Sequence, residues 1–155
     1  MNIRRAEKKD IEKIKGLLNQ VLMVHHNIRP DLFKSNCRKY TDEELFEIIE
    51  DDQRPIFVAE DEEVVLGYAF LVIIKHLNDN ILTDIKTLYI DDLCVDENAR
   101  GKHIGKKLYE YVLDYAKEIG CYNVTLNVWQ GNDSAMTFYE RCGLKPQKIG
   151  MEVIL

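Results

Sequence analysis

Apolar residues recur along this chain with two periods, one helical and one strand-like. Helical spacing follows Asp10, extends from Thr41 to about Asp51, and returns from Ile104 to Ile119. Thr41 and Glu44 have the spacing of a capping box, and Gly120 predicts the end of the third helix. The pattern therefore predicts three amphipathic helices, each with one face packed against a sheet.

Continuous or alternating apolar runs predict the strands of that sheet, at 1–5, 55–60, 64–74, 81–95, 122–128 and 149–155. A charged turn joins the second and third strands as an antiparallel hairpin. The third helix separates the fourth strand from the fifth, which predicts a right-handed parallel crossover. Early antiparallel strands and a late βαβ unit predict an α/β fold with a mixed sheet. Asn132 is placed to cap a short last helix, and the irregular stretch 25–40 is long enough to shape a binding site.

Length and composition fit a single domain over residues 1–155. With 46% hydrophobic and 31% charged residues, the chain has the composition of an ordinary globular protein. Its first residues turn charged before any apolar run could act as a signal sequence, and the longest apolar run, 64–74, is too short to span a bilayer. We therefore expect a cytoplasmic protein with no membrane partner.

Charge and cysteine spacing restrict the partners further. A formal net charge of −6 argues against a general nucleic-acid surface and would favour a cationic substrate. The four cysteines are widely spaced, without ligand-like spacing to any histidine. We expect reduced thiols and no metal site.

Candidate chemistry concentrates between Tyr89 and Gly120, where the chain reads YIDDLCVDENARGKHIGKK and continues into the third helix. Gly101 and Gly105 allow the backbone to approach a ligand closely, and the helix that follows presents unpaired N–H groups. The basic side chains here are Arg100, Lys102, Lys106 and Lys107. A strand, a basic loop and a helix N-terminus in this order predict a phosphate or pyrophosphate site.

Known nucleotide signatures do not fit this loop. Gly101 and Gly105 are too close together for a Walker A motif, and a Rossmann fingerprint needs a third glycine. The loop resembles the pyrophosphate loop of the GCN5-related N-acetyltransferases (the GNAT family), with Arg100 and Gly105 at the outer positions and His103 where the family usually has its first glycine. The stretch NDSAMTFYERCGLKP, from Asn132 to Pro146, resembles the family's C-terminal signature.

The resemblance implies an acetyl-CoA co-substrate, no metal cofactor, and a set of binding residues. The residues expected to bind the pyrophosphate are those of the loop, namely Arg100, Gly101, Lys102, His103, Ile104, Gly105 and Lys106. The strand backbone of Leu93, Cys94 and Val95 is expected to bind the pantetheine arm, and Asn132 to contact the same arm. Tyr139 matches the family's tyrosine that contacts the cofactor and protonates the departing thiolate. Each has a structural alternative: Asn132 as a helix cap, Tyr139 as a core aromatic, Cys94 as a packed residue.

Two carboxylates are candidates for the base that removes a proton from the amine. Alternation along a strand places Asp91 on the face of Leu93 and Val95, and Asp92 on the other face with Cys94. We favour Asp91 as the base or amine-orienting acid and keep Asp92 second; either could instead have a structural role. Some relatives carry a catalytic glutamate on the next strand, where this chain has Asn127.

The resemblance implies a GNAT fold, with a mixed, largely antiparallel sheet of about six to seven strands and about four helices. It implies an N-acetyltransferase that moves an acetyl group from acetyl-CoA to a primary amine by direct attack in a ternary complex. The acceptor is expected to be a small cationic amine, and a homodimer is possible. The alternative is a non-catalytic acyl-CoA-binding sensor or partner-binding module on the same fold.

Overall fold

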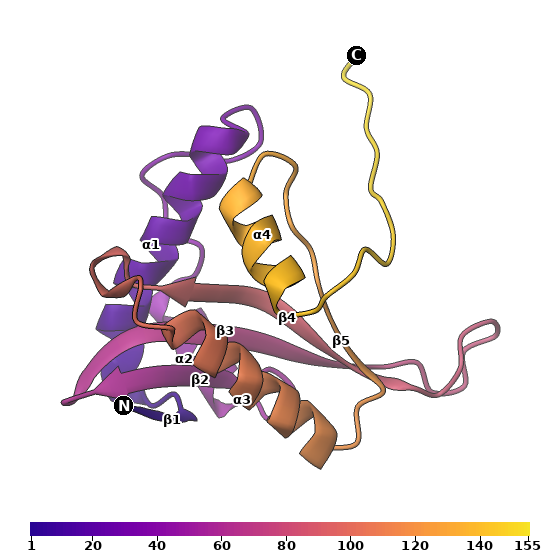
Figure 1. Ribbon diagram of the computed structural model, residues 1–155, viewed down its shortest axis with the longest axis horizontal. Coiled ribbons are helices and arrows are strands. Elements are labelled where there is room, and N and C mark those ends of the chain that lie inside the picture. The colour runs from indigo at the N-terminus through magenta and orange to yellow at the C-terminus, as the bar shows by residue number, and fades with distance from the viewer.

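A twisted five-stranded sheet forms the centre of the computed structural model, which describes residues 1–155 (Figure 1). The strands lie side by side in chain order and are β1 (Asn2–Arg5), β2 (Ile56–Asp61), β3 (Val64–Lys75), β4 (Lys86–Val95) and β5 (Asn123–Leu126). The first three junctions are antiparallel, and β4 pairs with β5 in parallel. The predicted mixed sheet with a late βαβ unit is confirmed.

Helices cover both faces of this sheet. The helices α1 (Ile11–Ile28) and α2 (Asp42–Glu50) share one core with β2 and β3, around side chains such as Ile14, Leu45 and Tyr68. The helix α3 (Ile104–Glu118) forms a second core on the other face with Leu88 and Ile90. The short helix α4 (Asp133–Arg141) stands beside the end of β4, as Figure 1 shows. Two 3-10 turns, η1 (Lys8–Asp10) and η2 (Glu97–Ala99), complete the elements, and no helix is long and apolar enough to cross a membrane.

Two predicted strands differ from the structure. The run 81–95 becomes a strand only from Lys86, because 76–85 forms a long exposed turn after β3. The run 149–155 forms no strand at all: it is an exposed tail that leaves the body of the molecule (Figure 1). The sheet therefore has five strands rather than six to seven, because residues 149–155 pair with none of them.

A close approach at Gly67 holds β3 against β4. Gly67 pairs with Val95, and a Cβ atom at Gly67 would lie 2.6 Å from the backbone oxygen of Cys94. Such a contact cannot be relieved by rotating a side chain, since the neighbour is backbone. Only glycine, which has no Cβ atom, fits this position without displacing β4.

Replacing Gly67 with Ala should therefore lower the free energy of unfolding by about 1–3 kcal/mol, the usual cost of overpacking. Gly16 is the matched control, since it lies within α1 with nothing within 4 Å of its added Cβ. Gly16→Ala should raise the free energy of unfolding by about 0.5–1 kcal/mol, because alanine favours a helix interior. Urea denaturation measures both, and equal effects of the two variants would contradict the close approach.

Candidate active site

The site begins where β4 and β5 separate. Their pairing ends at Ile90 opposite Leu126, although β4 continues to Val95. At this point β4 has one extra residue relative to β3: Leu71 pairs with Ile90 and Phe70 with Asp92, so Asp91 has no partner in the ladder. Such a bulge bends a strand and increases its twist. The second half of β4 consequently has an open side facing away from β3.

The bulge changes where the two carboxylates lie. Leu93 and Val95 pack on the α3 side, whereas Asp91 forms a salt bridge of 3.2 Å with Lys39, in the segment between α1 and α2 on the opposite face. The prediction that Asp91 shares a face with Leu93 and Val95 is wrong, because the extra residue reverses the alternation of side chains. Asp91 is exposed and its charge is paired.

Asp92 lies deeper in the same region. Tyr68 of β3, whose side chain is fully buried, donates a hydrogen bond of 2.6 Å to its carboxylate. Burial raises the pKa of Asp92, while this hydrogen bond and the charge of Lys39 act in the opposite direction. The structure thus places one exposed, paired carboxylate beside one half-buried carboxylate with a raised pKa.

The end of β4 offers backbone groups to the open side. The Asp96 N–H donates to the Leu66 oxygen of β3 at 2.8 Å. Because successive N–H groups of a strand point in opposite directions, the Val95 N–H points away from β3, toward the gap left by β5. Cys94 is buried, its thiol donates toward the Leu17 oxygen of α1 at 3.7 Å, and burial raises its pKa to about 12. The thiol is therefore protonated and enclosed, as in the packed-residue alternative.

The loop after β4 is anchored to α1 before it becomes exposed. The buried carboxylate of Asp96 accepts a hydrogen bond from the Asn98 N–H at 3.0 Å and pairs with Lys13 of α1. The Glu97 N–H donates to the Gln20 side chain of the same helix at 3.1 Å. These contacts fix the direction in which the chain enters the basic segment from Arg100 onward.

Two residues of the basic segment have left-handed backbone, Gly101 with φ 81° and His103 with φ 59°. His103 is the N-cap residue of α3, but its side chain caps none of the helix N–H groups. A non-glycine residue in this conformation costs about 1–2 kcal/mol. His103 therefore takes the kind of backbone conformation that glycine, which the family usually has here, adopts without strain.

The start of α3 has the features of an anion-binding site. The first turn holds no acidic residue, and its early N–H groups have no acceptor within the helix. A Cβ atom on Gly105 would lie 3.4 Å from the Phe138 ring of α4 and 3.5 Å from the Val95 side chain, so α3, α4 and β4 meet there. Arg100 and Lys102 precede this helix end in the sequence, and Lys106 lies in its first turn. The N-terminus of α3 thus lies at the gap, with a positive dipole end and basic neighbours.

Helix α4 brings the last predicted residues to the same gap. Asn132 is its N-cap and accepts a hydrogen bond from the Ala135 N–H at 3.3 Å, which is the structural alternative for that residue. Tyr139 is half-buried beside Phe138, with 5.1 Å between the ring centroids. Burial raises the pKa of Tyr139, and the negative charge of Asp92 raises it further. Tyr139 is therefore a protonated phenol close enough to Asp92 to sense its charge.

Sequence reasoning missed two contributors, Lys39 and Tyr68. A signal existed for Tyr68, because a tyrosine within a long apolar strand needs a partner for its hydroxyl. Lys39 lies in the irregular stretch predicted to shape a site, but nothing in the sequence paired it with Asp91. That pairing follows from the fold.

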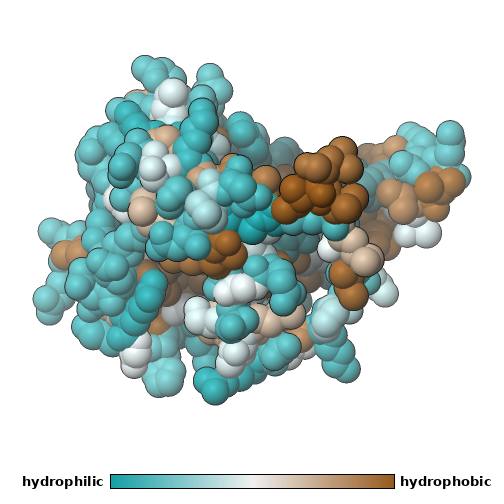
Figure 2. Space-filling model, turned by 90° about the horizontal axis from the view of Figure 1, so that it is seen from above, coloured by the Kyte–Doolittle hydropathy of each residue, from teal (hydrophilic) through white to brown (hydrophobic).

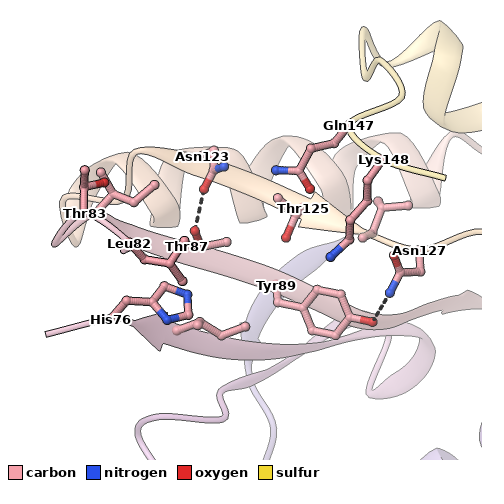
Figure 3. A pocket seen from close by; sticks show the side chains of 13 residues that line it. His76, Leu82, Thr83, Thr87, Tyr89, Asn123, Thr125, Asn127, Gln147 and Lys148 are labelled. Atoms are coloured by element: carbon pink, nitrogen blue, oxygen red, sulfur yellow. Dashed lines mark hydrogen bonds between the residues drawn. The ribbon is translucent and has the colours of Figure 1, made fainter. Parts of the chain in front are cut away.

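A cavity of about 430 Å³ opens next to this region, beside the paired part of β4 and β5 (Figure 3). Most of the residues that line it have polar side chains. Asn127 donates to the Tyr89 hydroxyl at 3.2 Å, and Thr87 donates to the Asn123 side chain at 2.6 Å. Neither Asp91 nor Asp92 lines it, although Tyr89 of the same strand does.

The comparison with protein families matches residues 22–144 to the acetyltransferase (GNAT) family. The glucosamine 6-phosphate N-acetyltransferase of Arabidopsis thaliana is 41% identical over 66 residues, which span 43% of this chain and 42% of that protein. The peptidyl-lysine N-acetyltransferase YjaB of Salmonella typhimurium is 26% identical over 94% of this chain and 83% of its own length. The match thus spans less than half of the Arabidopsis relative and most of the Salmonella one.

A solved structure shows the same architecture over the whole chain. A single-residue mutant of the BH1408 protein from Bacillus halodurans has a TM-score of 0.95 and 32% identity, and the alignment covers 100% of this chain and 99% of that one. The predicted fold family is confirmed by these matches, while the role of each site residue stays a prediction.

The pairing of Tyr68 with Asp92 yields a test within the site. Tyr68→Phe should raise the pKa of Asp92 further, because the hydroxyl that stabilises its charged form is lost, and should lower the free energy of unfolding by about 1–3 kcal/mol. Carboxyl ¹³C NMR titration measures the pKa. Tyr111→Phe on α3, on the other face of the sheet, should leave it unchanged. An unaltered Asp92 titration in Tyr68→Phe would show that burial alone sets this pKa.

Proposed function

The chain belongs to the acetyltransferase (GNAT) family, and on that premise we propose that it transfers an acetyl group from acetyl-CoA to a primary amine. One observation carries the proposal: at the gap between β4 and β5, the N-terminus of α3, an outward-pointing strand N–H and a protonated tyrosine lie near a half-buried carboxylate. These are the groups that holding a pyrophosphate, polarising a thioester and protonating a thiolate require. Acetyl-CoA, when bound, supplies the activated acetyl group.

Different residues along the gap bind different parts of acetyl-CoA. The segment from Arg100 to Lys106 holds the pyrophosphate through backbone N–H groups and basic side chains. The backbone of Leu93 to Val95 aligns the extended arm in the way an added strand pairs with an edge. Asn132, which already caps α4, is the residue of that helix that would contact the same arm.

In this proposal, Asp92 is the base that removes a proton from the amine. An alkyl amine has a pKa of about 10.4 and a free carboxyl a pKa of about 4, so an ordinary carboxylate is poorly matched as a base. Burial raises the pKa of Asp92, which improves the match, whereas Asp91 is exposed and paired with Lys39. Asp91 then orients the incoming ammonium by exchanging its Lys39 contact for the substrate.

Direct attack within a ternary complex is favoured over a covalent acetyl-enzyme. Cys94 is the only cysteine on the strand, and its thiol is enclosed with a pKa of about 12. A thiol of this kind holds almost no thiolate at neutral pH and is a poor nucleophile. The amine itself therefore attacks the acetyl group, and steady-state kinetics should show intersecting rather than parallel lines.

The acceptor we propose is a small cationic amine. The carboxylates of Asp91 and Asp92 attract an ammonium, and the net charge of −6 favours a cation over distance. Beyond the amine, the cavity beside Tyr89 offers hydroxyl and amide groups to a polar body, as in an amino sugar or a polyamine. The relatives named above act on a sugar amine and on a lysine amine, which are both primary amines.

A thiol-release assay with a panel of amines tests this function. Polyamines, amino sugars and lysine peptides are each supplied with acetyl-CoA, and CoA affinity is measured by calorimetry. We expect release of free thiol only when an amine is present. Binding of CoA without thiol release from any amine would favour the alternative, an acyl-CoA-binding sensor that keeps the fold but not the reaction.

Replacement of Tyr139 by Phe tests the proposed proton donor. Turnover should fall by about 100-fold or more, because the departing thiolate loses its acid, while CoA affinity changes little. Tyr122→Phe is the control, since that side chain is 75% exposed on the segment before β5. Unchanged turnover in Tyr139→Phe would remove this residue from the reaction.

A further inference from the structure

The side-chain nitrogen of Lys39 lies among the acidic groups of the candidate site. Its Nζ atom is 3.2 Å from Asp91 Oδ2 and 5.3 Å from the centre of the Tyr40 ring. Burial lowers the pKa of Lys39, but the charges of Asp91 and Asp92 raise it more. A primary amine of the chain itself therefore lies beside the same two carboxylates that the proposed reaction assigns to the substrate amine.

Asp92 is a shared neighbour of Lys39 and Tyr139. Burial raises the pKa of Asp92, and the charge of Lys39 is one of the effects that oppose this rise. Burial also raises the pKa of Tyr139, and the charge of Asp92 raises it further. An amine, a candidate base and a candidate proton donor thus gather around one position of β4. The Lys39 side chain is 40% exposed, so its amine is accessible in the empty site.

The proposed binding mode of acetyl-CoA leads its acetyl group to this position. The pyrophosphate binds at the start of α3, and the extended arm lies along β4 from Val95 back toward Leu93. The next residue in that direction is Asp92, because a strand advances by about 3.3 Å per residue. The acetyl end of the arm therefore arrives beside Asp92, on the part of β4 that Lys39 already contacts through Asp91.

The segment that carries Lys39 is held to the sheet by a neighbouring side chain. Residues 34–40 make no hydrogen bond between backbone groups. The Tyr40 ring stacks on the Phe70 ring of β3, with 5.9 Å between the centroids. Figure 2, which looks onto the end of α1 before this segment, shows a largely hydrophilic surface there. Lys39 is thus kept near β4 by Tyr40, while its own backbone is free to adjust.

We propose that Lys39 is itself an acetyl acceptor, so that each chain acetylates this lysine from its own bound acetyl-CoA. This inference rests on the proposed function of the same site. Acetylation removes the positive charge of Lys39, and Asp91 then loses its ion-pair partner. The modified chain keeps both carboxylates without an internal cation, which leaves them open to a cationic amine from solution.

The transfer needs no group beyond those already described. The Lys39 ammonium gives one proton to Asp92, and the neutral Nζ atom attacks the acetyl carbon. A C–N bond forms, the C–S bond breaks, and the departing thiolate takes the proton of Tyr139. The new amide nitrogen releases its second proton, which restores the Tyr139 phenol, and Asp92 passes the first proton to solvent. The products are an acetyl-lysine, the free thiol of CoA and one proton.

Peptide mass spectrometry of the full chain, incubated with acetyl-CoA and no added amine, tests this inference. We expect one acetyl group on Lys39, gained at least about 100-fold faster than on Lys34, because only Lys39 is placed beside the acetyl group. Lys34 is exposed in the same segment and reports uncatalysed acetylation. Absence of acetyl-Lys39, or acetylation of Lys39 no faster than that of Lys34, overturns the inference.

Two controls show whether the transfer takes place within the site of one chain. Excess free CoA, which occupies the cofactor site without an acetyl group, should slow the acetylation of Lys39 and not that of Lys34. The fraction of Lys39 modified per minute should be independent of protein concentration, because each chain modifies itself. A rate that ignores free CoA, or that rises in proportion to protein concentration, would contradict the inference. Lys34→Arg should leave the acetylation of Lys39 unchanged.

Lysine ¹³C NMR adds a readout that needs no transfer. Lys39→Arg, which keeps the positive charge, identifies the Cε resonance of Lys39 by its loss. Free CoA should shift this resonance and leave that of Lys34 in place, and a Lys39 resonance that does not respond to saturating CoA also overturns the inference. Thiol release with added amines but without acetyl-Lys39 rejects this inference alone. Absence of both thiol release and acetyl-Lys39 rejects the proposed function as well.

Discussion

The arrangement of the site depends on one extra residue in β4. The bulge at Asp91 comes immediately after the last pair between β4 and β5, so the strand bends away just where its neighbour ends. Three consequences follow from this single insertion. The two carboxylates come to the α1 side, the N–H of Val95 faces an open gap, and the helices α3 and α4 can both approach that gap. Without the insertion, the alternation that follows Ile90 would direct Asp92 toward α3 and separate it from Tyr68.

Burial distinguishes two carboxylates that look equivalent in the sequence. Asp91 and Asp92 are adjacent in the sequence. Asp91 is exposed and forms an ion pair with Lys39, whereas Asp92 is less exposed and accepts a hydrogen bond from the buried hydroxyl of Tyr68. Lys39 lies close enough to sense both charges, which together with burial set its own pKa; burial lowers it, but the carboxylates raise it more. The site therefore holds a local cation beside the two carboxylates. In the proposed reaction, a substrate ammonium would compete with this residue of the chain itself.

The sequence predicted the fold class, the helices and most strands because apolar periodicity reports which face is buried. It predicted the helix caps at Thr41 and Asn132 for a similar reason, since capping is a local property. It did not predict which acid is buried, because a one-residue bulge leaves no mark in the pattern of apolar positions. It also predicted a last strand at 149–155, which the structure lacks. Apolar alternation there indicates that the segment could form a strand, but the alternation does not show whether any strand is available to pair with it.

His103 has one more consequence for the loop that opens α3. A glycine at this position would be free to adopt either hand of the backbone in the unbound protein, so binding would have to select one of many loop shapes. A histidine held at φ 59° has far fewer shapes to choose from, and the strain is already present before any ligand arrives. The loop is thus preorganised, and less conformational entropy is lost when an anion binds. In this chain, the backbone angle at His103 thus restricts the mobility of the empty loop and lowers the entropy lost in the proposed binding of an anion.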